Sequence, residues 1–335
     1  MTNMRINNIL FAAALAVTSL NVPAHAEPLK IRAAWSSLPA HMLPAIFLAK
    51  DGLRHYGQSY VVEPQAFQAT TPMITAMAAK QIDVSVFAPT AMAVGVTNAN
   101  LDIKVIGDNI QDGVPGYRQI SVFVKSGSGI EKVEDLKGKR IGVNAIGSTS
   151  QSMIVVMLRK RGMDEKRDVQ FVEVSLANQL PMIDDGKVDA VTQIPDDLVK
   201  AGKYKVLFDW AQAMGRTQGS FLAVRTDFLK ENRAALLDFT EDYLRSLRWF
   251  YNPANHAAAV KLVAEWARRP AADLDYMFTK ADYYRDPNLM PDIAGLQRVI
   301  DTSFDLGALK QKIEVAPYVD LSLVEEAKKR IEANP

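Results

Sequence analysis

The chain of 335 residues contains no cysteine, which excludes disulfide bonds, thiol catalysis, zinc–thiolate sites and a lipid attached through cysteine. Histidine is also scarce, and the four histidines show no metal-ligand spacing: His25, His41, His55 and His256. No serine lies in the sequence context of a nucleophile elbow. We therefore expect no catalytic residues, no metal site and no cofactor, and we predict that the protein is not an enzyme.

Excess charge and long hydrophobic runs are lacking too. Arg5 is the only charged residue before Glu27, and in the rest of the chain the 38 acidic side chains are matched by as many basic ones. This balance argues against a nucleic acid or another polyanion as partner. The apolar run at 9–17 is shorter than the roughly 20 residues that a membrane span needs, and no second long run follows.

The N-terminus has the three parts of a cleavable signal peptide. Arg5 supplies the positive region, 9–17 is the apolar core, and Ala24-His25-Ala26 has the small-x-small form that signal peptidase cuts. We predict a signal peptide at 1–26, cleavage near Ala26/Glu27 and export to a bacterial periplasm. An N-terminal membrane anchor is the alternative. About 309 residues would remain, enough for two lobes given the 48% hydrophobic content.

Short apolar segments alternate with helical patterns along the first two thirds of the chain. Strands are predicted at 29–34, 60–62, 82–87, 103–106, 120–124, 141–143, 169–174, 188–191, 204–208 and 220–224. After 224 the pattern is helical, at 230–251, 255–268, 271–279, 293–304 and 322–332. The alternation predicts an α/β protein with mostly parallel sheets covered by helices on both faces.

Two segments of the chain resemble each other. Lys80-Gln81-Ile82-Asp83-Val84, with a proline-opened helix downstream, parallels Lys187-Val188-Asp189-Ala190-Val191 with the same continuation. This weak internal repeat favours two lobes of one architecture. Coincidence is the alternative, because an aspartate before a short strand is common.

Residues 140–152, Arg-Ile-Gly-Val-Asn-Ala-Ile-Gly-Ser-Thr-Ser-Gln-Ser, lead from a buried strand through two glycines into a helix. Ser148 followed three residues later by Gln151 is a capping-box pattern. The first N–H groups of a helix have no partner within it, and the helix dipole adds partial positive charge there, so an oxyanion is favoured. Ser148 as a plain cap is the alternative.

Three segments carry a family resemblance: 41–53, 135–143 (Asp-Leu-Lys-Gly-Lys-Arg-Ile-Gly-Val) and 186–190 (Gly-Lys-Val-Asp-Ala). With these segments the chain, over roughly 30–230, resembles the periplasmic substrate-binding proteins of the sulfonate, taurine and nitrate ABC importers. That family includes binders of thiamine-pyrimidine precursors. The segments are poor guides to the ligand, because such folds bind chemically different solutes. Arg54-His55-Tyr56-Gly57 departs from the family's more usual Phe-x-x-x-Gly-Leu continuation.

The resemblance implies a type II periplasmic binding protein fold with a two-strand hinge near 117–125 and 218–226. Lobe one would comprise 28–118 and 219–335, and lobe two 119–218. The solute would be enclosed by hinge closure, and the closed form would be recognised by an ABC permease in the inner membrane. We expect a monomer.

Ligands of open α/β sheets bind beyond the carboxyl ends of strands, where helices begin. That rule, with Arg118 at the implied hinge, selects these candidate ligand-binding residues: Trp35, Ser36, Ser37, Thr70, Thr71, Phe87, Thr90, Arg118, Asn144, Ser148, Thr149, Ser150, Asn178 and Asp196. The hydroxyl residues would donate to an oxyanion, and Trp35 and Phe87 would wall the pocket. Arg118 would pair with a carboxylate or sulfonate, and Asp196 with a ligand amine.

Each specific role has a structural alternative. Trp35 and Phe87 can belong to the core, Arg118 can be a solvent-exposed arginine, and Asp196 can cap its helix. His41 can face the cleft or be a structural histidine.

The leading hypothesis is a periplasmic solute-binding component of an ABC importer for a small organic anion, namely a sulfonate, a taurine-like solute or an aromatic carboxylate. One alternative is an enzyme of the thiamine-pyrimidine synthesis type, but that branch of the family depends on a cysteine-rich motif that this chain lacks. Another is a binding module that reports to a sensor.

Overall fold

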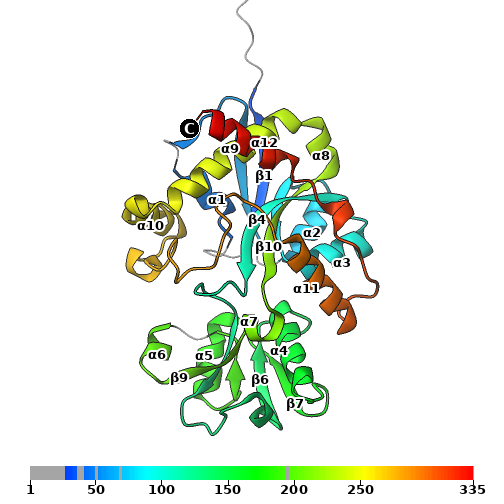
Figure 1. The fold of residues 1–335 in the computed structure, drawn as a ribbon, viewed down its shortest axis with the longest axis vertical. Helices are drawn as coiled ribbons and strands as arrows, with labels where there is room; N and C mark the ends of the chain where they lie inside the picture. The colour runs from blue at the N-terminus through cyan, green and yellow to red at the C-terminus, as the bar shows by residue number, and fades with distance from the viewer. Residues whose placement is uncertain (1–26, 36–40, 50–51, 68–69, 194–195, 335) are drawn as a thin grey trace, which may run out of the picture.

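The computed structural model describes residues 27–35, 41–49, 52–67, 70–193 and 196–334, without the side chains of Ala45, Thr70, Thr71, Asp196 and Asp197. The predicted signal peptide, Ser36 and Ser37 lie outside the described residues. Within the described ranges, no helix combines the length and hydrophobicity needed to cross a membrane. The chain forms an upper and a lower lobe joined by two extended segments (Figure 1).

The upper lobe, lobe one, is built on a five-stranded sheet of order β2-β1-β3-β10-β4. Its strands are β1 (Leu29–Trp35), β2 (Tyr60–Ala66), β3 (Val84–Phe87), β4 (Ile103–Asp112) and β10 (Thr217–Arg225). Its helices are α1 (Leu43–Ile46), α2 (Thr70–Ala78), α3 (Pro89–Ala99), α8 (Thr226–Glu231), α9 (Arg233–Phe250), α10 (His256–Ala267), α11 (Ile293–Asp305) and α12 (Ser322–Ala333).

The lower lobe, lobe two, has a second five-stranded sheet of order β7-β6-β8-β5-β9. Its strands are β5 (Ser121–Lys125), β6 (Lys139–Val143), β7 (Val169–Glu173), β8 (Ala190–Val191) and β9 (Tyr204–Asp209). Its helices are α4 (Thr149–Lys160), α5 (Gln179–Asp184), α6 (Asp196–Lys200) and α7 (Trp210–Met214), with 3-10 turns η2 (Val133–Leu136) and η3 (Leu176–Asn178). The two-lobed α/β fold is therefore confirmed. The predicted lobe limits at 118/119 and 218/219 stay predictions.

Each sheet is mixed: four of its five strands run in one direction, in agreement with the predicted mostly parallel sheets, and one strand runs against them. In lobe one, β1 is parallel to β2 and β3, but β10 is antiparallel to β3 and β4. In lobe two, β6 is parallel to β7 and β8, but β5 is antiparallel to β8 and β9. The physical reason is that β10 and β5 each enter their sheet from the junction between the lobes and run away from it. Alternation of strands and helices along the chain does not reveal that direction.

Most predicted elements are confirmed to within a few residues, but three differ in a way that matters for the junction. β4 extends to Asp112, six residues past its predicted end, because polar residues continue the ladder with β10. α7 was not predicted, and α1 is only four residues long. The crossings between lobes are residues 113–120 and 215–216, earlier in the chain than the hinge positions that the resemblance implies.

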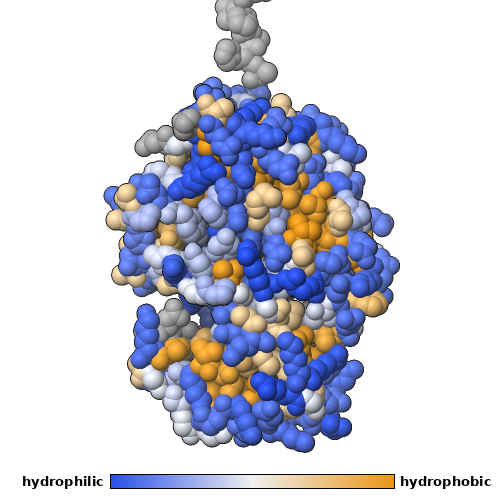
Figure 2. Space-filling view, viewed as in Figure 1, coloured by the Kyte–Doolittle hydropathy of each residue, from blue (hydrophilic) through white to orange (hydrophobic). Residues whose placement is uncertain are grey.

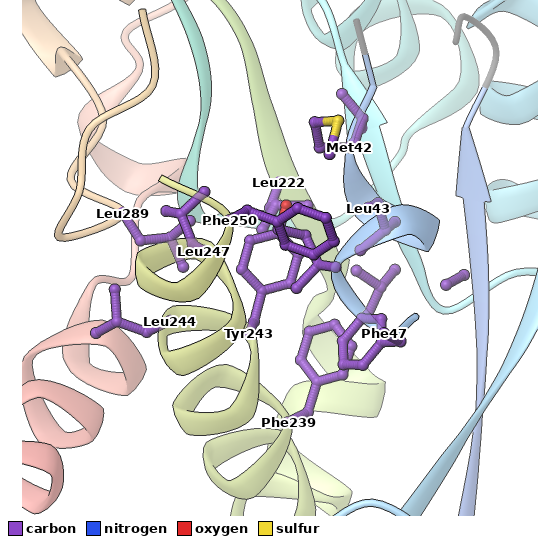
Figure 3. Packing of buried hydrophobic residues seen from close by; sticks show 14 of the residues in the cluster. Met42, Leu43, Phe47, Leu222, Phe239, Tyr243, Leu244, Leu247, Phe250 and Leu289 are labelled. Carbon is purple, nitrogen blue, oxygen red and sulfur yellow. The ribbon is translucent and has the colours of Figure 1, made fainter. Parts of the chain in front are cut away.

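Apolar clusters lie on both faces of each sheet. In lobe one, α1, α9 and α12 cover one face, where Leu43, Phe239, Tyr243 and Phe250 interlock (Figure 3). α2, α3 and α11 cover the other face. Tyr243, Leu247 and Phe250 recur at 3- to 4-residue spacing in the sequence, which predicts a core-facing stripe, and their burial on α9 confirms that prediction. The tail helices therefore complete the core of lobe one.

The segment 54–57, which departs from the family pattern, is anchored to the buried carboxylate of Asp242 on α9. That carboxylate accepts hydrogen bonds from the N–H groups of Arg54, His55 and Tyr56 at 2.8, 3.0 and 3.1 Å. It also accepts from the hydroxyl of Tyr60 at 2.9 Å. The departure thus has a structural role: it fixes the entry to β2 against α9.

The two lobes are packed together on the side of α11. Val299 of α11 is buried in the apolar cluster of lobe two, beside α4 and α7. On the side of α10 and α6, the space-filling surface is indented where the lobes meet (Figures 1 and 2). The junction is therefore closed along one side and hollow along the other.

Candidate ligand-binding site

Both sheets direct the carboxyl ends of their parallel strands at the junction. β10 begins at the junction and is antiparallel to β3, with Phe221 beside Phe87, so β3 ends near the junction. β5 likewise begins there and is antiparallel to β8, with Phe123 beside Val191. The described residues that follow β3, β6 and β8 therefore face the space between the lobes, which is where open α/β sheets bind ligands.

The loop after β6 is held by side-chain hydrogen bonds at the start of α4. The Oγ of Ser148 accepts from the N–H of Gln151 at 3.3 Å, which confirms the predicted cap. The Oε1 of Gln151 accepts from the N–H of Gly147 at 2.6 Å, one residue earlier than a capping box requires. Ser150 is buried, and its hydroxyl donates to the Oδ1 of Asn144 at 2.7 Å. Ser148, Ser150 and Asn144 therefore fix the loop.

Two backbone donors remain at this helix start. Among the described residues, the N–H groups of Thr149 and Ser150 donate no hydrogen bond, and the half-buried Thr149 hydroxyl has no hydrogen-bond partner either. These are the first helical positions, where the dipole favours negative charge. The loop is tied to β7 because the carboxylate of Glu173 accepts from the N–H of Ile146 at 3.1 Å.

A buried glutamine that the sequence interpretation missed fixes the loop after β8. The Oε1 of Gln179 accepts from the N–H groups of Thr192 and Gln193 at 3.0 and 2.8 Å. Asn178, just before it, is exposed on η3 with no side-chain capping bond. The backbone of Asp196 begins α6, but its side chain is outside the description. Gln179 was missed because one glutamine in a helical pattern carries no information about its partners.

In lobe one the predicted aromatic walls differ from each other. Trp35 ends β1 and is buried, with its ring 5.6 Å from that of Trp266 at the end of α10. Phe87 is fully buried within the core on the α2 and α3 face, which favours its structural alternative. The hydroxyl of Thr90 lies 3.1 Å from that of Ser303 on α11, and so it serves the packing of α3 on α11.

The first turn of α2 contains Thr70 and Thr71, whose side chains are not described. Thr71 followed by Pro72 predicts a helix with the proline at its first position, but the helix begins at Thr70, so Pro72 is its third residue. Their predicted contacts with a ligand stay predictions.

Arg118 lies in the crossing between the lobes, where its N–H donates to the carbonyl of Asp282 at 2.9 Å. Its guanidinium is 5.1 Å from the ring centroid of Tyr276 and 6.0 Å from that of Tyr283. These are cation–π distances. The residue is half-buried, so the alternative of a plain exposed arginine does not describe it.

A polar cluster on β4 and β10 was also missed, because the strand was predicted to end before it. Burial raises the pKa of Asp108 to about 7. The hydrogen bond that the Nε2 of Gln218 donates to its carboxylate at 2.6 Å has the opposite, weaker effect on that pKa. The amide of Asn109 donates to the hydroxyl of Ser220 at 2.7 Å.

Burial and the charge of Arg285 lower the pKa of His41 to about 4, so this histidine is neutral at pH 7, as its structural alternative requires.

The described residues contain no group of three or more His, Asp or Glu side chains arranged to hold a metal ion. The donors at the junction are instead backbone N–H groups, hydroxyls, amides and guanidinium groups. Such a set suits an anion.

Two α/β lobes whose parallel strands end at a shared junction define the class of two-lobed periplasmic binding protein folds. The chain belongs to the NMT1/THI5 like family, whose model matches residues 61–257. Among relatives, it is 24% identical over 265 residues, 78% of this chain and 76% of the other, to an aliphatic sulfonates-binding protein of Bacillus subtilis (strain 168).

Solved structures with this fold bind different solutes. The periplasmic aliphatic sulphonate binding protein SsuA of Escherichia coli matches with a TM-score of 0.71 at 18% identity, covering 88% of this chain and 92% of that chain. The periplasmic nitrate-binding protein NrtA of Synechocystis PCC 6803 matches with a TM-score of 0.69 at 13% identity, covering 91% and 90%. The desulfurization enzyme DSZB matches with a TM-score of 0.65 at 12% identity, covering 90% and 99%. These likenesses establish the fold alone.

Proposed function

We propose that this protein is the periplasmic solute-binding component of an ABC importer and captures a small organic anion between its lobes by hinge closure. The anion would be a sulfonate, a taurine-like solute or an aromatic carboxylate. The protein would act as a monomer after signal-peptide cleavage near Ala26/Glu27, with an inner-membrane permease as partner. Relatives named for sulfonate and nitrate binding support the solute class.

The observation that carries the proposal is the start of α4. Its N–H groups at Thr149 and Ser150 have no acceptor among the described residues, and the surrounding hydrogen bonds hold them in place. A hydrogen bond to a charged group contributes about 1.5–3 kcal/mol, and a helix N-terminus about 0.3–1 kcal/mol. Two such bonds and the dipole fall short of the roughly 8 kcal/mol of micromolar binding. Lobe one must therefore contribute, which is why closure belongs to the proposal.

Lobe one offers a different chemistry across the junction. The Trp35–Trp266 pair supplies apolar aromatic surface, and Arg118 supplies positive charge near the crossing. An anion with an apolar or aromatic body would use both lobes: its oxyanion at α4 and its body against the tryptophans.

Equilibrium titration of the purified protein against alkanesulfonates, taurine, benzoate-type carboxylates and nitrate tests the proposal. We expect at least one organic anion to bind and to raise the melting temperature, and no binding across the panel would overturn the proposal. Glu173→Gln is an informative variant, because glutamine can still accept the N–H of Ile146 while one negative charge near α4 is removed. Anion affinity should rise a few-fold at low salt and less at high salt.

An enzyme is the runner-up, because a desulfurization enzyme shares the fold. The chain contains no cysteine, so any such activity would need a different nucleophile. Mass spectrometry of a bound sulfonate or sulfinate after long incubation separates the two functions: a binding protein returns it intact. A sensor partner in place of an importer would be indicated by neighbouring genes that encode no permease.

A further inference from the structure

Asp112 is the last residue of β4, where the chain leaves lobe one. Its side chain is buried, and its Oδ1 has no hydrogen-bond partner in the described part of the chain. It faces Gly219 in an irregular stretch of the ladder with β10: a Cβ added at Gly219 would lie 2.2 Å from the Oδ2 of Asp112. A side chain at position 219 would therefore require the Asp112 carboxyl group to move.

The two crossings touch one residue further on. A Cβ added at Gly113 would lie 2.2 Å from the carbonyl oxygen of Gly215, and both glycines have positive φ, at +75° and +70°. Beside them, the carbonyl of Tyr284 accepts from the N–H of Gln111 at 3.0 Å, so the segment before α11 braces the end of β4. Asp112 is thus enclosed where the two connections between the lobes come into contact.

The charged and titratable groups around Asp112 are engaged elsewhere. Asp108, on the same strand, accepts from Gln218 and from the N–H of Asp286. In the crossings, Arg118 lies over the rings of Tyr276 and Tyr283, and Arg216 is hydrogen-bonded to Gln111. In the segment before α11, Asp282 is paired with Arg285, and Asp292 at the start of α11 lies near Arg298.

Within the described residues, no Lys or Arg nitrogen forms an ion pair with Asp112. Burial alone raises the pKa of Asp112 to about 7, and the charge of Asp112 in turn contributes to raising the pKa of Tyr283. A carboxyl in this position is more stable as the neutral acid, because ionisation would place an uncompensated charge in a dry site.

We propose that Asp112 is a proton-linked positioning residue for lobe closure: the neutral acid fits the packed junction, whereas the carboxylate draws in water and loosens it. The effect on ligand affinity rests on the proposed function, but the effect on lobe position does not. Because the folded-state pKa is raised, the stabilisation is fully present below the unfolded pKa of about 3.9 and is lost as the pH rises through about 7. The junction should therefore open with increasing pH.

Energy transfer between one dye on each lobe tests this without a ligand. Lys261→Cys on α10 and Lys200→Cys on α6 place exposed labelling sites on opposite sides of the indentation, and the chain has no other cysteine (Figure 1). In the ligand-free labelled protein, we expect transfer efficiency to fall with increasing pH and to level off by about pH 8, with a midpoint between the ordinary pKa of about 3.9 and the raised pKa of about 7. In Asp112→Asn, which cannot ionise, it should stay at the acid value. The exposed Asp185→Asn is the matched control and should follow the parent protein.

Asp108 is unchanged in these proteins, so the difference between parent and Asp112→Asn isolates Asp112. A parent curve that is flat, or an Asp112→Asn curve that follows the parent, overturns the proposal. The carboxyl-carbon chemical shift of Asp112 in the unsubstituted protein needs no variant, and titration below about pH 5 would also overturn it. If no anion binds at all, the proposed function fails, but the energy-transfer result still decides the role of Asp112.

Discussion

The same arginine–aspartate clamp occurs once in each lobe. In lobe one, Asp83 accepts from the N–H of Arg32 at 3.0 Å and from its Nε at 2.8 Å. In lobe two, Asp189 accepts from the N–H of Arg140 at 2.8 Å and from its Nε at 3.1 Å. Each clamp joins a strand, β1 or β6, to the short parallel strand that follows a crossover, β3 or β8. The internal repeat thus corresponds to a shared local geometry.

The surroundings of the two clamps differ. The Asp83 side chain is fully buried and also lies 3.1 Å from Arg225 of the returning strand β10, whereas the Asp189 side chain is 26% exposed. Lobe one has this second arginine because the chain returns to it and adds a strand and several helices. The same local pattern therefore contributes differently to the stability of each lobe, because the free energy of an ion pair depends on how deeply it is buried.

Asp83→Ala should have the largest effect. It removes the partner of Arg32 and leaves Arg225 buried with fewer acceptors, so we expect a loss of about 3–5 kcal/mol in the free energy of unfolding. Urea unfolding followed by circular dichroism measures it. A loss below about 1 kcal/mol would show that burial does not distinguish the clamps.

The helix starts of the two lobes give a second contrast. Thr149→Ala should weaken anion binding about tenfold, because it removes one donor to a charged group, while stability changes by less than about 0.5 kcal/mol. Thr90→Ala should instead cost about 1 kcal/mol of stability, through the lost contact with Ser303, and leave affinity unchanged. Calorimetric titration and thermal melts of both variants provide the comparison. If Thr90→Ala lost as much anion affinity as Thr149→Ala, Thr90 would have to be a ligand-binding residue after all.

Asp189→Ala should lower stability far less than Asp83→Ala, by under about 1 kcal/mol, because its partner Arg140 is substantially exposed. Burial by itself would raise the pKa of Asp189, but the hydrogen bonds from Arg140 lower the pKa by more, so the net shift is downward. The stabilisation is therefore present above the unfolded pKa of about 3.9 and is lost as the pH falls through the folded value. The free energies of unfolding of the two proteins should therefore converge as the pH falls below the folded-state pKa of Asp189, and a difference that persists in strong acid contradicts this account.

Local patterns predicted local features well. The cap at Ser148, the core stripe of α9 and most strand positions follow from residues close together in sequence. Predictions of side-chain direction were less successful. Ser150 was expected to face the solute, but it is buried and bonded to Asn144, and Phe87 lies in the core. Both depend on which side of a loop or strand faces the junction.

The sequence by itself determined the α/β class, the alternation of elements, the family resemblance and the hydroxyl-rich start of α4. These depend on periodicity and on contacts within a few residues, which short sequence patterns specify. The tertiary structure alone decided that β5 and β10 run antiparallel, that Gln179 holds the β8 loop and that Asp112 is enclosed beside Gly219. Each of these joins residues far apart in sequence, and the burial that gives them their energy exists only once both lobes have folded.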